Sequence, residues 1–381
     1  MHKYLLYLLV LALAPTLALA QNAEPVPCPE QSVVLDLSEL RELANLEDLS
    51  ELKQLAVLES PEYPQDMKDM VRLAMEEQTG DLSACTAAYD VEKRKVIEKS
   101  FKVTSKDILS FENEWGKVHV NTWDKNEVQV RVDVIARAGT EAKAQEVLNN
   151  IKVVESRSGN TYSFRTKREP MRISNNDKSM EINYTIYMPA NNAIAVKNSF
   201  GDVYLASLKG KADIDISYGS LKCDRLANSS NNVKLSYSSG SCTYINGGNL
   251  SIAFSSMKVD EASGLQGHSK YSDFKVGNLE QTMEMDLKYG SFKIDNISKN
   301  IQKISLDSGF TPVSLNFADN TAFNFDVNVQ FGNFNVDKSL VTITSHEKSY
   351  TSAEYKGRFG GASPKGLVSI TSKYGDVKFT K

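Results

Sequence analysis

The sequence predicts a mainly β protein: a single-stranded, β-helix-like β-solenoid with rungs of about 17 to 21 residues, preceded by a small helical N-terminal module. Three observations predict this class. A short phrase recurs ten times between Trp115 and Phe379: an aromatic residue, two small or polar residues, then apolar-x-apolar. From Phe200 to Tyr289 the aromatics follow one another at intervals of 17 to 19 residues. Residues on both sides of each aromatic alternate apolar with polar, as half-buried strands do. Such a period is typical of units that bury their apolar face by stacking on copies of themselves.

Composition bounds the class of protein further. The chain has 381 residues, of which 41% are hydrophobic and 24% charged. These values are ordinary for a folded chain of two or three domains. The formal net charge of −4 gives no reason to expect nucleic acid as a partner.

Residues 1–20 have the pattern of a cleaved signal peptide. Lys3 supplies the positive start, Leu5 to Leu13 the short apolar core, and Ala18-Leu19-Ala20 the small-x-small cleavage site. A membrane anchor needs about 20 apolar residues, and Pro15 interrupts this stretch. We therefore expect an exported protein without a transmembrane segment in its mature chain, located in the periplasm, at the cell surface or outside the cell.

The next two segments precede the repeats. Residues 21–29 are rich in proline and predict a linker, and residues 30–99 predict a leucine-rich helical module. Leucine falls at every third position from Leu37 to Leu58, among strong helix formers. A fragment of leucine-rich repeat is the alternative, but its asparagine signature is missing. Val91 to Lys99 is expected to be a charged connector at the end of the module.

Residues 100–190 predict the N-terminal cap and the first rung of the solenoid. A cap is required because an open stack presents unpaired strand edges. The alternating pattern predicts strands, and one amphipathic stretch predicts a helix. The expected strands are Ile108–Phe111, Lys117–Thr122, Val128–Ala136, Thr161–Thr166 and Glu181–Met188, and the expected helix is Glu141–Asn150.

Residues 191–381 predict the repeats proper. Each repeat has a strand before its aromatic and a strand after it, as around Tyr218. The Gly or Ser that follows the aromatic is expected to form the corner, with Gly supplying positive φ. The aromatic itself is expected to point inward, so that the rings form a ladder at one edge of the core. Residues 345–366 interrupt the rhythm and predict a hairpin or a loop before the last rung.

The four cysteines fall into two pairs. Cys223 and Cys242 occupy the same position of successive repeats, so they would stack about 4.8 Å apart, within the Cα range of a disulfide. Two buried free thiols are the alternative for this pair. Cys28 and Cys85 bracket the N-terminal segment, and export favours a disulfide between them.

A row of lysines is the first candidate for a binding surface. The outward position between the two apolar residues of the phrase recurs along the stack, and aspartates stand two residues further on. The interpretations are a solvated row of mixed charge, or a lysine stripe that binds an anionic polysaccharide; the alternating aspartates favour the first. The row comprises Lys222, Ser241, Lys258, Lys275, Lys293 and Lys378, and the aspartates are Asp224, Asp260 and Asp295.

Catalytic and metal-binding patterns are weak. The acids at the corner, Asp202, Asp273 and Asp376, could bind calcium or act on a sugar. They stand in different rungs, however, and Asp is a common turn residue. The histidines show no metal-ligand spacing. We therefore predict no catalytic residues, no metal site and no cofactor.

The stretch from Glu98 through Trp115-Gly116-Lys117-Val118-His119-Val120-Asn121-Thr122-Trp123, with the helix after it, resembles a known family. Together with the Tyr-Gly-Ser/Asp repeats and the final Tyr374-Gly375-Asp376, it is similar to secreted bacterial putative adhesins, β-solenoid domains of unknown function frequent in Bacteroidetes. The resemblance covers about residues 100–381. It implies a β-helix-like fold, a location in the cell envelope and a role in adhesion, and it carries no catalytic residues.

The predicted function is therefore that of an exported, non-enzymatic adhesin or envelope-interaction protein. Its expected partner is an envelope glycan or another envelope protein. One alternative is a carbohydrate-active enzyme, a polysaccharide lyase or hydrolase, on the same scaffold. Another is an envelope regulatory protein that acts through the helices of residues 30–99.

Overall fold

A computed structural model describes residues 91–169, 178–361 and 364–381. The predicted signal peptide, linker, most of the helical module and the Cys28–Cys85 pair lie outside these residues. The chain separates into two compact units, Met1–Cys85 and Thr86–Lys381, and the fold below is that of the second. Among its described residues, no helix has the length and apolar character needed to cross a bilayer.

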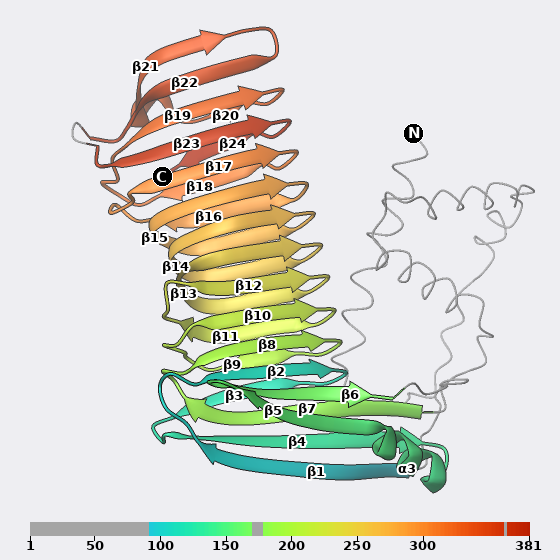
Figure 1. The fold of residues 1–381 in the computed structure, drawn as a ribbon. Helices are drawn as coiled ribbons and strands as arrows, with labels where there is room; N and C mark the ends of the chain where they lie inside the picture. The colour runs from blue at the N-terminus through green and yellow to red at the C-terminus, as the bar shows by residue number, and fades with distance from the viewer. Residues whose placement is uncertain (1–90, 170–177, 362–363) are drawn as a thin grey trace, which may run out of the picture. The chain divides into compact units, whose positions relative to one another are not determined.

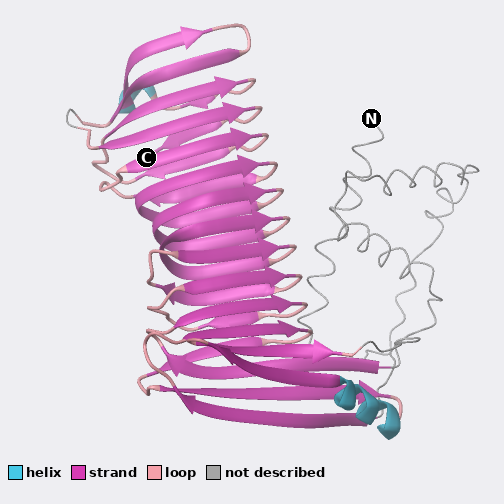
Figure 2. Cartoon of the chain, in the orientation of Figure 1, coloured by secondary structure: helices cyan, strands magenta, loops and turns pink. Residues whose placement is uncertain are grey.

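The mainly β class is confirmed. The described strands form one mixed sheet of 24 strands, accompanied by the helix α3 (Glu141–Asn150) and the short 3-10 helix η4 (Lys338–Leu340). Figures 1 and 2 show the strands stacked one above another in two layers. We call the strands before each aromatic the leading column and those after it the trailing column.

Both columns are built from parallel neighbours in register. The leading column is, in spatial order, β2 (Ile108–Glu114), β8 (Ala193–Ser199), β10 (Ala212–Ser217), β12 (Asn231–Ser236), the second halves of β13 (Ser239–Ala253), β14 (Ser256–Lys270) and β15 (Asp273–Lys288), then β17 (Lys303–Gly309), β23 (Gly366–Lys373) and β19 (Phe323–Gln330). The trailing column is β3 (Val118–Trp123), β9 (Val203–Leu205), β11 (Ser220–Leu226), the first halves of β13 to β15, then β16 (Ser291–Ile297), β18 (Val313–Phe317), β24 (Val377–Thr380) and β20 (Phe334–Asn335).

The core lies between the two columns. Because side chains of a strand alternate between its faces, every second residue points inward and meets the same position of the next rung. Ile214 and Ile216 of the leading column and Leu221 of the trailing column are all at most 2% exposed. These rows join into one contiguous apolar cluster. The outward residues between them are therefore free to carry function.

An antiparallel cap covers the N-terminal end. On the trailing side, β7 (Lys178–Pro189) pairs with β4 (Glu127–Ala138), and β4 pairs with β1 (Val91–Lys102). On the leading side, β6 (Thr161–Arg168) pairs with β5 (Ile151–Ser158), a strand that the sequence pattern did not predict. Helix α3 has the predicted bounds and buries Ala144, Val147 and Leu148.

The expected connector at Val91 to Lys99 was wrong. These residues belong to β1, which is paired along its whole length with β4. Ile97 and Phe101 pack against the core from alternate positions. Seven of the twelve residues are charged, as suits a strand at the open edge of a sheet, and this charge masked the period of two.

The inward orientation of the aromatics was also wrong. All ten have φ between 51° and 63°, so the backbone turns at the aromatic itself and sends the ring outward. Eight of the ten side chains are exposed, from 37% at Trp115 to 56% at Phe331. The predicted ladder does form: consecutive ring centroids lie 4.4–5.1 Å apart and neighbouring planes differ by 2–9°.

The small residue after the aromatic serves close backbone contact rather than positive φ. A Cβ on Gly290 would lie 1.9 Å from the carbonyl oxygen of Ser272 in the preceding rung. Where serine stands instead, its hydroxyl closes the corner: Ser255 donates to the carbonyl of Ala253 at 2.7 Å and accepts from the amide of Ser238 at 2.9 Å.

Chain order and spatial order differ at the C-terminal end. The last rung, β23–β24, lies between the rung of β17–β18 and the rung of β19–β20. The segment between them in sequence forms the hairpin of β21 (Val341–Lys348) and β22 (Ser352–Phe359), with β22 antiparallel to β19. The expected interruption is thus a hairpin, at the uppermost end of the stack in Figure 1.

Candidate functional site

The structure places the predicted lysine row on the outward face of the trailing column. Lys222, Ser241, Lys258, Lys275 and Lys293 are register partners in that order, and Ser314 separates them from Lys378. This arrangement makes the row continuous along the trailing column.

Three lysines of this row are paired with carboxylates of the same face. Lys258 contacts Asp260 at 2.7 Å, and Lys275 and Lys293 both contact Asp295 at 2.8 Å. Hydrogen bonds from the two ammonium groups hold the pKa of Asp295 below its usual range, and the bond from Lys275 has the larger effect. An anionic ligand would have to compete with these carboxylates for the lysines.

The three corner acids brace the corners of neighbouring rungs. Asp202 accepts from the hydroxyl of Ser220 at 2.5 Å, and Asp273 accepts from Ser291 at the same distance. The third, Asp376, accepts from the backbone amide of Asn333 at 2.8 Å. They lie in separate parts of the stack and do not converge on one site.

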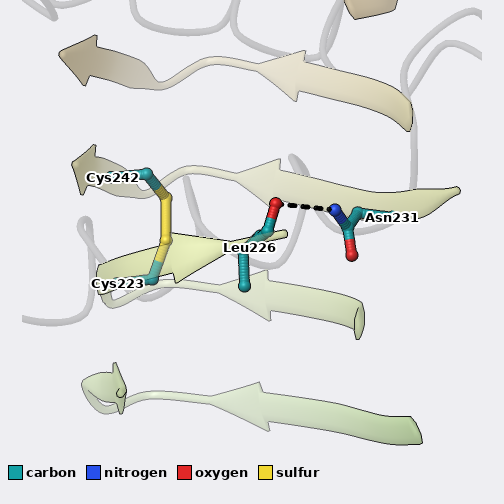
Figure 3. Close-up of a disulfide and its surroundings, with 4 residues drawn as sticks. All are labelled: Cys223, Leu226, Asn231 and Cys242. Carbon is teal, nitrogen blue, oxygen red and sulfur yellow. Dashed lines mark hydrogen bonds between the residues drawn. A yellow bond between two sulfur atoms is a disulfide. The ribbon is translucent and has the colours of Figure 1, made fainter. Parts of the chain in front are cut away.

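Cys223 and Cys242 are joined by a disulfide between successive rungs of the trailing column (Figure 3). Their Cα atoms lie 4.6 Å apart and both side chains are buried. In the same view the side-chain amide of Asn231 donates to the carbonyl of Leu226 at 3.3 Å. The Cys223–Cys242 disulfide is thus a covalent link between two rungs inside the core.

A polar hollow lies on the opposite, leading face. It has a volume of about 380 Å³ and is lined from successive strands β13, β14, β15 and β17. One row of register partners supplies Asn249, Gln266, Glu284 and Ser305, and the row beside it supplies Asp286 and Asp307. We call these six residues, with Gly267 and Met285, the leading-face hollow.

Gly267 shapes this hollow. Its φ is +138°, and an added Cβ would lie 1.9 Å from the carbonyl oxygen of Leu250. Only glycine fits at this inward strand position, where the backbone of Gly267 lies close to that of Leu250. The buried Met285 is the one apolar side chain of the lining. The exposed lining therefore consists mainly of amide, hydroxyl and carboxylate groups.

The carboxylates of the hollow differ in how they are balanced. Glu284 is paired with Lys303 at 3.3 Å. Within the described part of the chain, no basic side chain forms an ion pair with Asp286 or Asp307. The described residues also contain no group of three or more potential metal ligands in binding geometry. The hollow therefore presents hydrogen-bond acceptors with a residual negative charge.

A Ser–His pair lies beside the hollow. Ser251 Oγ is 2.9 Å from His268 Nε2, and Asp286 is the register partner of His268 in the next strand. The order of the three resembles a hydrolytic triad. In the described structure, however, Asp286 makes no hydrogen bond with His268, so the orienting contact is missing. The pair adds a hydroxyl and an imidazole to the polar surface.

Glu261 and Glu280 form a pair of acids that the sequence pattern did not predict. Glu261 shares a hydrogen bond with Glu280, and this contact, with burial, raises the pKa of Glu261. The guanidinium of Arg225 lies over the ring of Tyr244, 3.6 Å from its centroid. The carboxyl pair stands at the corner where each trailing strand leads to the next leading one, outside the hollow.

The leading-face hollow was missed because its residues are 17 to 21 positions apart and differ in type. One signal was available: Gly267 occupies an inward strand position between Leu250 and Met285 in register, and glycine within a strand marks a bulge or a close backbone approach. That signal locates the bare backbone but gives no information about the side chains that surround it.

Comparison with known proteins gives structural neighbours only. No protein-family model matches the sequence, and no curated protein matches it. The chain is similar to a putative adhesin from Bacteroides fragilis (TM-score 0.34, 11% identity, covering 75% of this chain and 97% of the other) and to one from Parabacteroides distasonis (0.34, 8%, 75% and 97%). It is also similar to a putative cell adhesion protein from Clostridium sporogenes (0.22, 12%, 76% and 99%). These structural neighbours are named putative adhesins or adhesion proteins, the family that the sequence resembles. Similarities at this level carry no argument about a ligand.

Proposed function

We propose that this protein is an exported β-solenoid that binds a polyhydroxylated polymer, a neutral or amino-bearing glycan of the cell envelope, and that it acts without catalysis. Parallel pairing in register along both columns supports the solenoid as the scaffold. The location rests on the predicted signal peptide.

The observation that carries the proposal is the leading-face hollow. Amide, hydroxyl and carboxylate groups from four successive strands line it side by side. Ligand sites combine such a concave shape with a few convergent polar groups. Saccharide hydroxyls both donate and accept hydrogen bonds, so amides and carboxylates in adjacent rungs can satisfy them. Because the same outward positions repeat along the column, a chain of sugars could extend beyond the hollow.

Charge selects among glycans. Asp286 and Asp307 leave the hollow with unpaired negative charge, which disfavours anionic polysaccharides. On the other face, three of the lysines that would attract an anion, Lys258, Lys275 and Lys293, are paired with Asp260 or Asp295. A neutral or amino-bearing glycan is therefore the better match to the leading face.

Two observations support binding over catalysis. The corner acids brace turns, and the Ser251–His268 pair lacks a carboxylate that would orient the histidine. A glycosidase needs two carboxyl groups on either side of the bond that it cleaves. The corner acids do not converge in this way, and Asp286 and Asp307 of the hollow stand side by side in one row of register partners.

A glycan array with the mature protein, followed by titration calorimetry on the strongest hit, tests the proposal. Gln266→Ala and Asp307→Ala remove one amide and one carboxylate from the hollow and should each weaken binding about tenfold or more. The control is the triple variant Lys258→Ala/Lys275→Ala/Lys293→Ala on the opposite face, which should leave affinity unchanged. Loss of binding in the triple variant alone would assign the ligand to the lysine row, and the absence of any glycan hit would overturn the proposal.

A further inference from the structure

The last rung of the chain is inserted between two rungs that precede it in sequence. β23 pairs with β17 over seven residues and with β19 over eight, all parallel. β24 pairs with β18 and β20 in the other column. We call residues 366–381 the inserted segment and the space between the flanking rungs its slot.

The slot matches this segment in detail. Tyr374 stacks between Phe310 and Phe331 in the aromatic ladder, at 4.6 and 4.8 Å. Phe379 is 2% exposed and meets a cluster of five phenylalanine rings from both flanking rungs and from the hairpin. Thr380 donates to the side-chain oxygen of Asn316 at 2.7 Å. Among the rungs that the structure describes, no other offers the same set of contacts.

The strands that flank the slot precede the inserted segment in the sequence. The flanking strands lie within residues 303–335, and the inserted segment follows the hairpin and a connection of residues 360–365. During folding, the flanking rungs can form while the inserted segment is still free. Contacts between elements distant in sequence form late because loop closure costs entropy. A second copy at sufficient concentration offers the same segment to the same slot.

We propose that the inserted segment exchanges between two copies of this protein, each filling the other's slot, and that the chain thereby forms strand-exchanged dimers. Every contact of the segment would be kept, since an identical chain supplies it, and this makes exchange a low-cost route to a dimer. The occupant is set by the slot itself, whose aromatic and apolar positions match residues 366–381. The inference is independent of the proposed glycan.

Disulfide trapping between two differently tagged full-length copies tests exchange. Ser314 of β18 and Lys378 of β24 are outward register partners. One residue further along the strand, on the inward side of the same column, the register partners Cys223 and Cys242 already form a disulfide between neighbouring rungs. One copy carries Ser314→Cys and the other Lys378→Cys. The copies are unfolded together in reductant, refolded at increasing concentration, oxidised and separated on a non-reducing gel.

The matched control is Ser241→Cys in one copy and Lys258→Cys in the other, which are also register partners on this face but lie in rungs that follow chain order. Exchange predicts a covalent heterodimer from the first mixture, with a yield that rises with concentration, and none from the second. A single chain with both Ser314→Cys and Lys378→Cys should form the bond internally, which verifies the geometry. If that chain bonds but the mixture gives no heterodimer, or if both mixtures give the same yield, the proposal is refuted.

Discussion

The left-handed backbone at the corner aromatics predicts that glycine is more stable than alanine at these positions, the reverse of the usual order in a strand. At Phe254 φ is 51°, and the ring stacks on Tyr237 at 4.8 Å and on Tyr271 at 4.9 Å. A side chain at this φ clashes with its own backbone, whereas glycine does not. Replacing Phe254 by alanine removes the ring and keeps the backbone strain. Replacing it by glycine removes the ring and the strain together.

The magnitudes follow from these contacts. Each ring stack contributes about 0.5–1.5 kcal/mol, so both variants lose about 1–3 kcal/mol from the two stacks. The left-handed conformation costs a residue with a Cβ about 1–2 kcal/mol. Glycine avoids this cost and loses about 0.5–1 kcal/mol through its more flexible unfolded state. We therefore expect Phe254→Gly to be more stable than Phe254→Ala by about 0.5–1 kcal/mol.

Urea unfolding midpoints followed by circular dichroism measure the order of the two variants. The control is Lys258, an outward strand residue without positive φ, where the ordinary order should hold and alanine should be more stable than glycine. The expected result is thus a reversal between the two positions. If alanine is at least as stable as glycine at position 254, backbone strain at the corner is not what the φ angle indicates.

Three further changes test the packing and the electrostatics. Gly290→Ala should cost about 1–3 kcal/mol through overpacking, since its Cβ would meet the carbonyl of the preceding corner at 1.9 Å; chemical denaturation measures this. Cys223→Ala/Cys242→Ala removes a cross-link that spans 19 residues, and the loop-entropy model predicts a loss of about 3 kcal/mol, seen as a lower melting temperature. Glu280→Gln should raise the melting temperature at pH 7–8, because the folded pKa of Glu261 is raised by Glu280 and its ionisation opposes folding above that pKa. This gain should vanish below about pH 4, where Glu261 is protonated in both states.

Each of these three has an outcome that contradicts it. Wild-type stability in Gly290→Ala would mean that the neighbouring rungs can separate. Equal melting of wild type with and without reductant would mean that the link between the rungs adds nothing. If the melting temperature of Glu280→Gln exceeds that of wild type by the same amount at every pH, the difference in stability comes from packing and not from the ionisation of Glu261.

The repeat was readable because its signal is local. An aromatic followed by a small residue and an apolar-x-apolar strand defines both columns, and in-register stacking follows from burying equal positions together. The same pattern could not give the direction of the aromatic ring. A period of two predicts inward for Tyr218 and for every other aromatic, but a single residue in the left-handed region reverses its own side chain. That reversal depends on φ, which an aromatic residue does not signal.

The inserted segment shows a second limit. The spacing of 21 residues between Phe310 and Phe331 lies close to that of the earlier rungs, so chain order predicts that the two rungs are neighbours. Tyr374 stands between them instead. Spacing identifies units that can stack, and every unit shares the same phrase, so it cannot rank which pairs do. The ranking comes from side chains such as Phe379, whose ring partners lie in four different elements, β18, β19, β20 and β22.

The hollow and the slot meet at one strand. Ser305 and Asp307 line the hollow from β17, and β17 is also the strand on which β23 of the inserted segment lies. Exchange would keep this border intact, because the incoming β23 has the same sequence as the one it replaces. A strand-exchanged dimer would therefore carry two complete hollows on one particle. A polymer with repeated sugars could occupy both, and linked sites raise overall affinity by effective concentration without any new contact. Glycan affinity that grows with polymer length in the dimer, and stays constant in the monomer, is the behaviour that joins the two proposals.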